Sequence, residues 1–102
     1  MVKSYFVYII ECKNGSYYTG YTTDIERRYA EYLDGSIKCK YTRANPPKRL
    51  AASWEFKATL SDILRIEKAI KKLSKQEKHA LVKNQDMIRN IIQQLEILDS
   101  AK

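Results

Sequence analysis

The sequence is poor in side chains that bind transition metals or form disulfides. Among 102 residues there is one histidine, His79, and there are two cysteines, Cys12 and Cys39. Zinc fingers and zinc hydrolases need several such ligands and are therefore nearly excluded. Nucleases that use histidine as general base are also disfavoured. The two cysteines lack C-x-x-C spacing and follow no secretory signal, so we expect reduced thiols in the cytoplasm.

Long apolar runs and acidic residues are also scarce. No run approaches the roughly 18 apolar residues of a membrane helix, so we expect no membrane partner. Twelve acids face 19 Lys and Arg, which gives a net charge of +7. This balance favours a polyanionic partner such as nucleic acid, although a basic protein without such a partner fits it too. The length suffices for one domain with one core.

Tyrosine, by contrast, is abundant and confined to one region. All eight tyrosines lie between residues 5 and 41. Segment 17–28 predicts a strand, a tight exit at Gly20, and a helix from Thr23, which has capping-box spacing to Glu26. Two phenols would then precede a helix that presents Arg28, and such groups could bind a phosphate. These residues also have an ordinary explanation, because Tyr is favoured in strands and Arg is common on protein surfaces.

The turn before this segment decides where two of the phenols point. Residues 5–12 and 16–22 predict two strands of a hairpin. A two-residue turn would send Tyr8 and Tyr18 to opposite faces of the sheet. A three-residue loop with left-handed Gly15 would place both on the same face, and we favour this loop.

The rest of the chain predicts a third strand and several amphipathic helices. The first helix spans Asp24 to about Leu33, with a buried stripe of Ile25, Tyr29 and Leu33 and with Arg28 and Tyr32 meeting on another face. The third strand spans 49–57, with Leu50, Ala52, Trp54 and Phe56 alternating. The second helix is capped by Ser61 and has an apolar stripe of Ile63, Ile66, Ile70 and Leu73. A capping box at Ser74 starts a third helix, and the tail, 85–101, predicts a last amphipathic helix that packs on the core or on a second copy.

One carboxylate of the second helix stands at the margin of its apolar stripe. Glu67 lies four residues after Ile63 and three before Ile70. A carboxylate at the edge of a buried face usually has a partner or a task. Pairing with Lys68 or Lys71 is the simplest explanation, and a functional task is the other.

Two segments are strongly basic. Residues 35–54 contain five cations and no acid, and we expect the loop residues Lys38, Lys40, Tyr41 and Arg43 to contact phosphates and stack on a base. Residues 68–83 hold six lysines against one acid, and we include Lys71 and Lys72 in this nucleic-acid surface. A solvated loop explains the first segment about equally well.

Taken in order, four short motifs resemble the GIY-YIG endonuclease domain. They are Phe6-Val7-Tyr8, Tyr18-Thr19-Gly20, Arg28 and Glu67. The resemblance runs from about residue 5 to 82 and is strongest to small stand-alone bacterial members. We therefore expect a nuclease-like domain over residues 1–83 and a helical extension, 84–102, packed on the same domain.

The resemblance implies an α+β fold: a small three-stranded antiparallel sheet flanked by helices, to which the tail adds an amphipathic helix. It implies cleavage of DNA with one divalent cation, Mg²⁺ or Mn²⁺. The family's catalytic positions fall on Tyr8, Tyr18, Arg28, Tyr32 and Glu67, with Glu67 as the metal ligand. We expect Tyr18 to be the general base and Tyr8 and Tyr32 to position water or phosphate. All five should converge on one pocket.

Three departures from the family pattern stand out. Phe6 replaces the first glycine, Thr19 replaces the isoleucine of the second motif, and a later asparagine has only Asn84 as a candidate. The missing asparagine bears on the surroundings of the metal and on catalytic strength.

The function expected is a DNA endonuclease of low sequence specificity in repair or recombination, acting on branched or single-stranded DNA, with a protein partner that targets it. The oligomeric state stays open. A binding or adaptor domain without turnover is the alternative. A second nuclease chemistry would use Glu55 and Lys57 as an E-x-K metal site, with Asp34 upstream.

Overall fold

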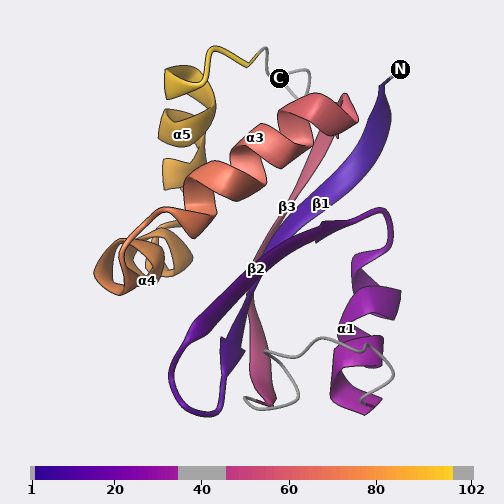
Figure 1. The fold of residues 1–102 in the computed structure, drawn as a ribbon, viewed down its shortest axis with the longest axis vertical. Helices are drawn as coiled ribbons and strands as arrows, with labels where there is room; N and C mark the ends of the chain where they lie inside the picture. Colours follow the sequence, from indigo (N-terminus) through magenta and orange to yellow (C-terminus); the bar gives the residue numbers. More distant parts are fainter. Residues whose placement is uncertain (1, 35–45, 98–102) are drawn as a thin grey trace.

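The computed structural model describes residues 2–34 and 46–97, which form one three-stranded sheet and its helices (Figure 1). In chain order the elements are β1 (Lys3–Cys12), β2 (Tyr17–Thr22), α1 (Ile25–Asp34), β3 (Pro47–Ala58), α3 (Leu60–Lys71), α4 (Lys75–Lys83), a 3-10 turn (Gln85–Met87) and α5 (Ile88–Gln94). The sheet is antiparallel with strand order β2-β1-β3. The expected α+β class is confirmed.

The β1–β2 hairpin has the three-residue loop. Gly15 has a φ of +85°, and its N–H donates to the Cys12 carbonyl over 2.9 Å. Tyr18 pairs with Ile10, and Gly20 pairs with Tyr8. The prediction that Tyr8 and Tyr18 share one face is therefore confirmed.

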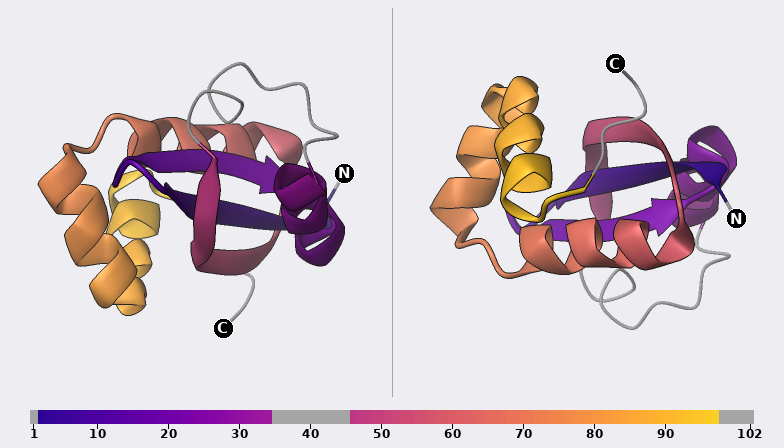
Figure 2. Two further views of the ribbon diagram at one scale, coloured as in Figure 1. Left: turned by 90° about the horizontal axis from the view of Figure 1, so that it is seen from below. Right: turned by 90° about the horizontal axis from the view of Figure 1, so that it is seen from above.

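Each face of the sheet has its own core. Val7 and Ile9 of β1 pack against buried residues of α3, α4 and α5. Tyr8, Ile10 and Cys12 point the other way, because side chains alternate along a strand, and pack with residues of α1. Figures 1 and 2 show α3, α4 and α5 grouped on one side and α1 apart from them.

Two of the three expected helix caps are wrong by one or two residues. At α1 the cap is Asp24, whose Oδ1 accepts the Arg27 N–H over 3.1 Å, and Thr23 is not the cap. Thr22 Oγ1 in turn accepts the Asp24 N–H, which fixes this turn. At α3 the cap is Thr59, which accepts the Asp62 N–H, and Ser61 is already helical. The capping box that starts α4 at Ser74 is confirmed.

Two predictions of buried side chains also need correction. In β3 the pairing skips Ala51, since Ile9 pairs with Ala52 and Ile10 with Leu50. This bulge turns Leu50 to the α1 face, whereas Trp54 and Phe56 pack on the other. In α1 the side chain of Leu33 is exposed and Tyr32 is buried instead.

The tail is shorter as a helix than expected. α5 begins at Ile88 and is followed by Glu96 with a φ of +57°, after which the Ile97 N–H donates to the Ile92 carbonyl. Such a left-handed residue ends a helix, so the predicted span to residue 101 is wrong. Ile88 and Ile92 are buried in the larger core. No helix in the described part of the chain is long and apolar enough to cross a membrane.

Candidate active site

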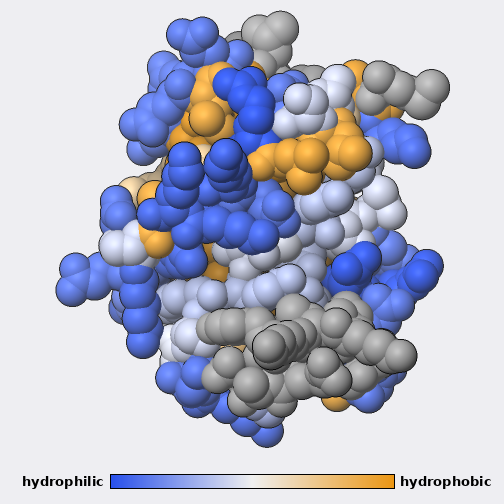
Figure 3. Space-filling model, in the orientation of Figure 1, coloured by the Kyte–Doolittle hydropathy of each residue, from blue (hydrophilic) through white to orange (hydrophobic). Residues whose placement is uncertain are grey.

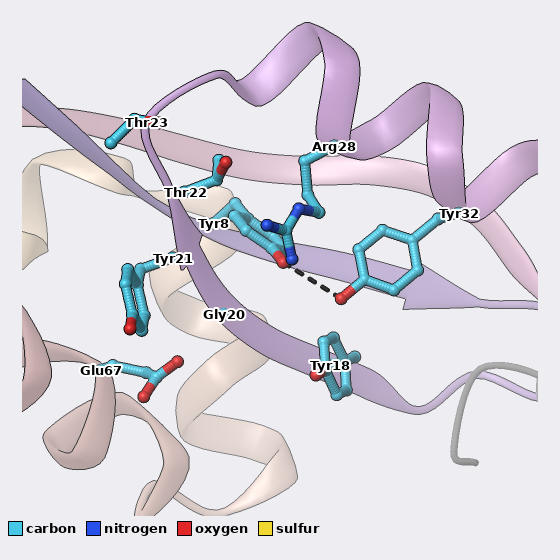
Figure 4. Close-up of a pocket in the computed structure, with 9 residues that line it drawn as sticks. All are labelled: Tyr8, Tyr18, Gly20, Tyr21, Thr22, Thr23, Arg28, Tyr32 and Glu67. Atoms are coloured by element: carbon cyan, nitrogen blue, oxygen red, sulfur yellow. Dashed lines mark hydrogen bonds between the residues drawn. The ribbon is translucent and has the colours of Figure 1, made fainter. Parts of the chain in front are cut away.

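A cavity of about 350 Å³ lies around the open edge of strand β2 (Figure 4). Strand β2 is at the edge of the sheet, so no strand of residues 2–34 and 46–97 pairs with its outer side. Helix α1 contributes from one face of the sheet and α3 from the other. The lining residues are Tyr8, Tyr18, Gly20, Tyr21, Thr22, Thr23, Arg28, Tyr32 and Glu67.

Three phenols cluster on the α1 side of this cavity. The hydroxyls of Tyr8 and Tyr32 lie 3.1 Å apart, and the ring centroids of Tyr18 and Tyr32 are separated by 5.7 Å. Burial raises the pKa of Tyr32, and hydrogen bonds to Tyr8 and Tyr18 raise it further. Tyr32 therefore stays neutral at physiological pH and can act through its hydroxyl hydrogen bonds.

Gly20 is required by the position of Tyr8. A Cβ on Gly20 would lie 2.5 Å from the Tyr8 hydroxyl oxygen and 2.8 Å from the ring carbon that carries it. Both distances are far below van der Waals contact, and the ring is buried and cannot move aside easily. The glycine therefore allows the phenol of β1 to cross β2 and reach the cavity.

Arg28 enters the cavity from the second turn of α1. Its Nε lies 3.5 Å from Glu31 Oε1, and Arg27 lies 3.4 Å from the other oxygen of Glu31. The i, i+4 spacing places Arg28 on the same helix face as Tyr32. Figure 4 shows its guanidinium directed toward the hydroxyls of Tyr8 and Tyr32. A planar cation held beside hydroxyl groups is suited to binding phosphate.

Glu67 reaches the cavity from α3, on the other side of β2. Its side chain is 15% exposed, and one carboxylate oxygen lies 3.7 Å from Lys71 Nζ. Figure 4 shows the carboxylate next to Tyr21, across β2 from the three phenols. The five candidate residues thus surround a strand edge, although their helices lie on opposite faces of the sheet.

The oxygen donors of the cavity fit a hard divalent cation that keeps most of its water. The described residues contain no cluster of three or more His, Cys, Asp or Glu side chains that could enclose a metal. Among the described residues, Glu67 supplies the one carboxylate in the cavity lining. Mg²⁺ is commonly held by one or two carboxylates with waters and substrate phosphate, so this donor set fits it.

The remaining candidates fall into three groups. Lys71 contacts Glu67, and Lys72 is exposed and does not line the cavity. Glu55 is exposed on β3 and Asn84 caps the end of α4, so neither belongs to the lining. The predicted loop contacts lie outside the described residues; they are Lys38, Lys40, Tyr41 and Arg43.

Sequence reasoning missed three lining residues and one hydrogen bond of a histidine. Tyr21 pairs with Val7 and so points to the face opposite Tyr18. It joins the cavity only because the cavity wraps around the strand edge, which alternation alone does not reveal. Thr22 and Thr23 line the cavity through the turn before α1. His79, which sequence reasoning left without a partner, is exposed and shares a 2.8 Å hydrogen bond with the Tyr17 hydroxyl.

Comparisons with known proteins identify the family of the chain. The GIY-YIG catalytic domain matches residues 4–80. A UPF0213 protein of Halalkalibacterium halodurans is 46% identical over 79 residues, which cover 78% of this chain and 82% of that protein. One from Halobacterium salinarum is 48% identical over 74% of this chain and 95% of its own.

A solved structure supports the fold as well. The solution NMR structure of a UPF0213 protein from Bacillus halodurans is similar with a TM-score of 0.51 and 44% identity, over 79% of this chain and 84% of that one. The match to the catalytic domain spans most of the chain, from β1 to α4. The chain therefore belongs to the GIY-YIG catalytic domain family.

Proposed function

We propose that this chain is a divalent-metal-dependent endonuclease that hydrolyses phosphodiester bonds in DNA with low sequence specificity. The observation that carries the proposal is the convergence of Tyr8, Tyr18, Arg28, Tyr32 and Glu67 on one cavity at an open strand edge. An edge cavity leaves room for a strand of nucleic acid to pass. We place this activity in the cytoplasm, in DNA repair or recombination, with a protein partner that directs it to its target.

The charged groups have complementary tasks. Arg28 would bind the non-bridging oxygens of the scissile phosphate and stabilise the charge that grows there during attack. Glu67 would hold Mg²⁺ or Mn²⁺, which when bound supplies Lewis-acid stabilisation of the phosphate or the leaving oxygen. The ion pair of Glu67 with Lys71 would then open, and Lys71 would become available to a phosphate.

We assign the general base to Tyr18. Tyr8 and Tyr32 are buried and hydrogen-bonded to each other, which suits them to position water or phosphate. Tyr18 is half-buried on the same cluster and lines the cavity. A water would attack phosphorus as its proton passes to the Tyr18 oxygen, and the bond from phosphorus to the leaving oxygen would break. A nearby cation favours the phenolate form of a tyrosine, and Arg28 lines the same cavity.

The test is cleavage of labelled branched, nicked and single-stranded DNA with Mg²⁺ or Mn²⁺. Arg28→Ala and Glu67→Gln should each lower the cleavage rate by about 100-fold or more, the typical loss of a group that stabilises transition-state charge. Glu55→Gln is the matched control and should cleave like the native chain. Full activity of Glu67→Gln would refute the proposed metal ligand, and loss of activity in Glu55→Gln would favour the E-x-K chemistry.

One contact favours a second function, a nucleic-acid-binding domain without turnover. The Lys71 ammonium already neutralises Glu67, so the carboxylate is satisfied without a metal. This alternative predicts DNA binding that weakens steeply with salt and no cleavage with any divalent cation. The cleavage assay separates the two functions directly.

A further inference from the structure

Four lysines lie at the end of α3, at the start of α4 and in the hairpin loop. Lys71 ends α3 and contacts Glu67 of the cavity lining, Lys72 is the C-cap of α3, Lys75 opens α4, and Lys13 lies in the hairpin loop. Lys71 pairs with Glu67, and the other three lysines form no ion pair within the described ranges. Figure 3 shows hydrophilic surface over this end of α3 and hydrophobic surface over its beginning.

Lys75 of α4 lies close to the hairpin loop, although the two are far apart in sequence. Lys75 Nζ lies 3.6 Å from the position that a Cβ would take on Gly15. The capping box at Ser74 fixes the start of α4, and Leu81 and Val82 bury its inner face. Lys75 is therefore held in place beside the hairpin loop.

Along β2, Tyr17 lies between the hairpin loop and Gly20 of the cavity, and its ring is paired with that of His79. Tyr17 of β2 and His79 of α4 are hydrogen-bonded over 2.8 Å, with ring centroids 6.4 Å apart and planes tilted by 34°. The residue His79 is exposed and Tyr17 is half-buried. Lys75 lies one helical turn before His79, on the same helix face. Cations next to an accessible ring are the usual means of binding unpaired nucleotides.

Strand geometry sets the length of this surface. From Gly20 in the cavity to Tyr17, β2 advances three residues, or roughly 10 Å at about 3.4 Å per residue, and the hairpin loop follows. That distance accommodates one or two nucleotides of an extended strand beyond the scissile phosphate. Side chains alternate along a strand, so Tyr17 points to the same face of β2 as Tyr21, and both pack on the larger core. Tyr21 lines the cavity, so the surface meets the cavity on that face.

We propose that Lys13, Lys72, Lys75 and the Tyr17–His79 pair form a second nucleic-acid site, which holds the unpaired nucleotides that leave the active site along β2. The lysines contact phosphates, and a base stacks on His79. The inference rests on the proposed function, because it assigns the path of that nuclease's substrate. It also gives a reason for the hydrogen bond between Tyr17 and His79, which the nuclease chemistry does not use.

The charge part is tested by salt-dependent binding of a fluorescent 12-nucleotide single strand, measured by anisotropy in EDTA so that nothing is cleaved. The double variant Lys72→Gln/Lys75→Gln should reduce the slope of log K against log salt by about 1.4, at about 0.7 per single-strand phosphate contact. Lys3→Gln/Arg89→Gln removes the same charge elsewhere and should leave the slope near its native value. Equal slopes for the two double variants would overturn the proposal.

The stacking part is tested at His79. His79→Ala should weaken binding of the single strand about tenfold, whereas His79→Phe keeps a ring and should bind nearly as the native chain does. Equal losses in both variants would show that the Tyr17 hydrogen bond acts only structurally and would refute stacking. A 12-base-pair duplex should be indifferent to either change, and equal weakening of the duplex would also refute it.

Cleavage assays of the same variants keep the two proposals apart. If the nuclease assignment is correct and this site is wrong, the lysine and His79 variants cleave and bind like the native chain. If the nuclease assignment is wrong and this site is correct, binding in EDTA still depends on these residues although no cleavage occurs. The binding measurements alone therefore decide whether the second site exists.

Discussion

The two faces of the sheet bury different kinds of side chain. On the side of α3, α4 and α5 the core is largely aliphatic, and Val7, Ile9, Ile63, Ile66 and Ile70 have no exposed surface. On the side of α1 the core is smaller and built around Tyr8 and Tyr32, whose hydroxyls are hydrogen-bonded to each other. Apolar burial stabilises the fold on the first side, while the second keeps polar groups positioned next to the cavity.

The largest effect on stability should come from the aliphatic side. Ile66→Ala removes a fully buried side chain of α3 and should lower the free energy of unfolding by about 2–5 kcal/mol, measured by urea denaturation. Leu64, on the same helix, is 42% exposed, so Leu64→Ala should cost well under half as much. Equal costs would show that the core is not centred on this face.

A clash on the tyrosine side should come next. Gly20→Ala places a methyl group 2.5 Å from the Tyr8 hydroxyl and should cost about 1–3 kcal/mol, the usual range for overpacking. It should also lower cleavage more than Ile66→Ala does, because it displaces a lining side chain. In a Tyr8→Ala background the same substitution should cost much less, as a double-mutant cycle would show. If the free-energy costs of Gly20→Ala and Tyr8→Ala were additive, the strain would not arise from contact between these two residues.

Removing one hydroxyl should have a smaller effect. Tyr32→Phe deletes the hydrogen bond to Tyr8 and should cost about 0.5–1.5 kcal/mol at neutral pH, by urea denaturation. Burial raises the pKa of Tyr32 above the ordinary value of 10.0, so its contribution is complete below pH 10. Above pH 10 the unfolded chain ionises first, and the native advantage over Tyr32→Phe should shrink. A gap that widens with pH would contradict the neutral assignment.

The smallest effect is expected at Thr19, a polar residue on the aliphatic side. Its hydroxyl is buried and has no hydrogen-bond partner in the described part of the chain. Thr19→Val should raise the free energy of unfolding by about 1 kcal/mol, because it removes an unsatisfied polar group. Thr22→Val is the matched control and should destabilise, since Thr22 Oγ1 accepts the Asp24 N–H. If both substitutions changed the free energy of unfolding in the same direction, the hydroxyl of Thr19 would not differ from that of Thr22 as proposed.

Much of the fold followed from local signals in the sequence. Asn14 and Gly15 indicated a hairpin but allowed two turn types, and the three-residue loop was favoured because it gathers Tyr8 and Tyr18 on one face, which is confirmed. The apolar spacing of α3 and the capping box of α4 were also sufficient. These features depend on neighbours within a few residues, which is the range over which a sequence is informative.

The errors arose where a longer-range contact or a local competition decided the outcome. Thr22, Thr23 and Asp24 can all act as caps, and only the hydrogen bonds show that Asp24 does. Tyr32 replaces Leu33 in the core because it packs against Tyr8 on the α1 face of the sheet, where the two hydroxyls are hydrogen-bonded. No periodicity contains that information.

The site was predictable in membership but not in shape. The five residues of the family motifs all line the cavity. That they enclose a strand edge, with Tyr21 among them, depends on the packing of α1 and α3 on opposite faces. Their catalytic roles await the assays described above.

The extra residue in β3 has a consequence for how this small domain can change. Because the strand shifts its facing side chains at Ala51, Leu50 supports the tyrosines while its neighbours support the aliphatic layer. This segment of β3 thus contributes side chains to both cores. An inserted or deleted residue there would turn the side chains that face one core toward the other. A point substitution can change one core without the other. A change in the length of β3 affects both cores at once and should therefore be tolerated less well.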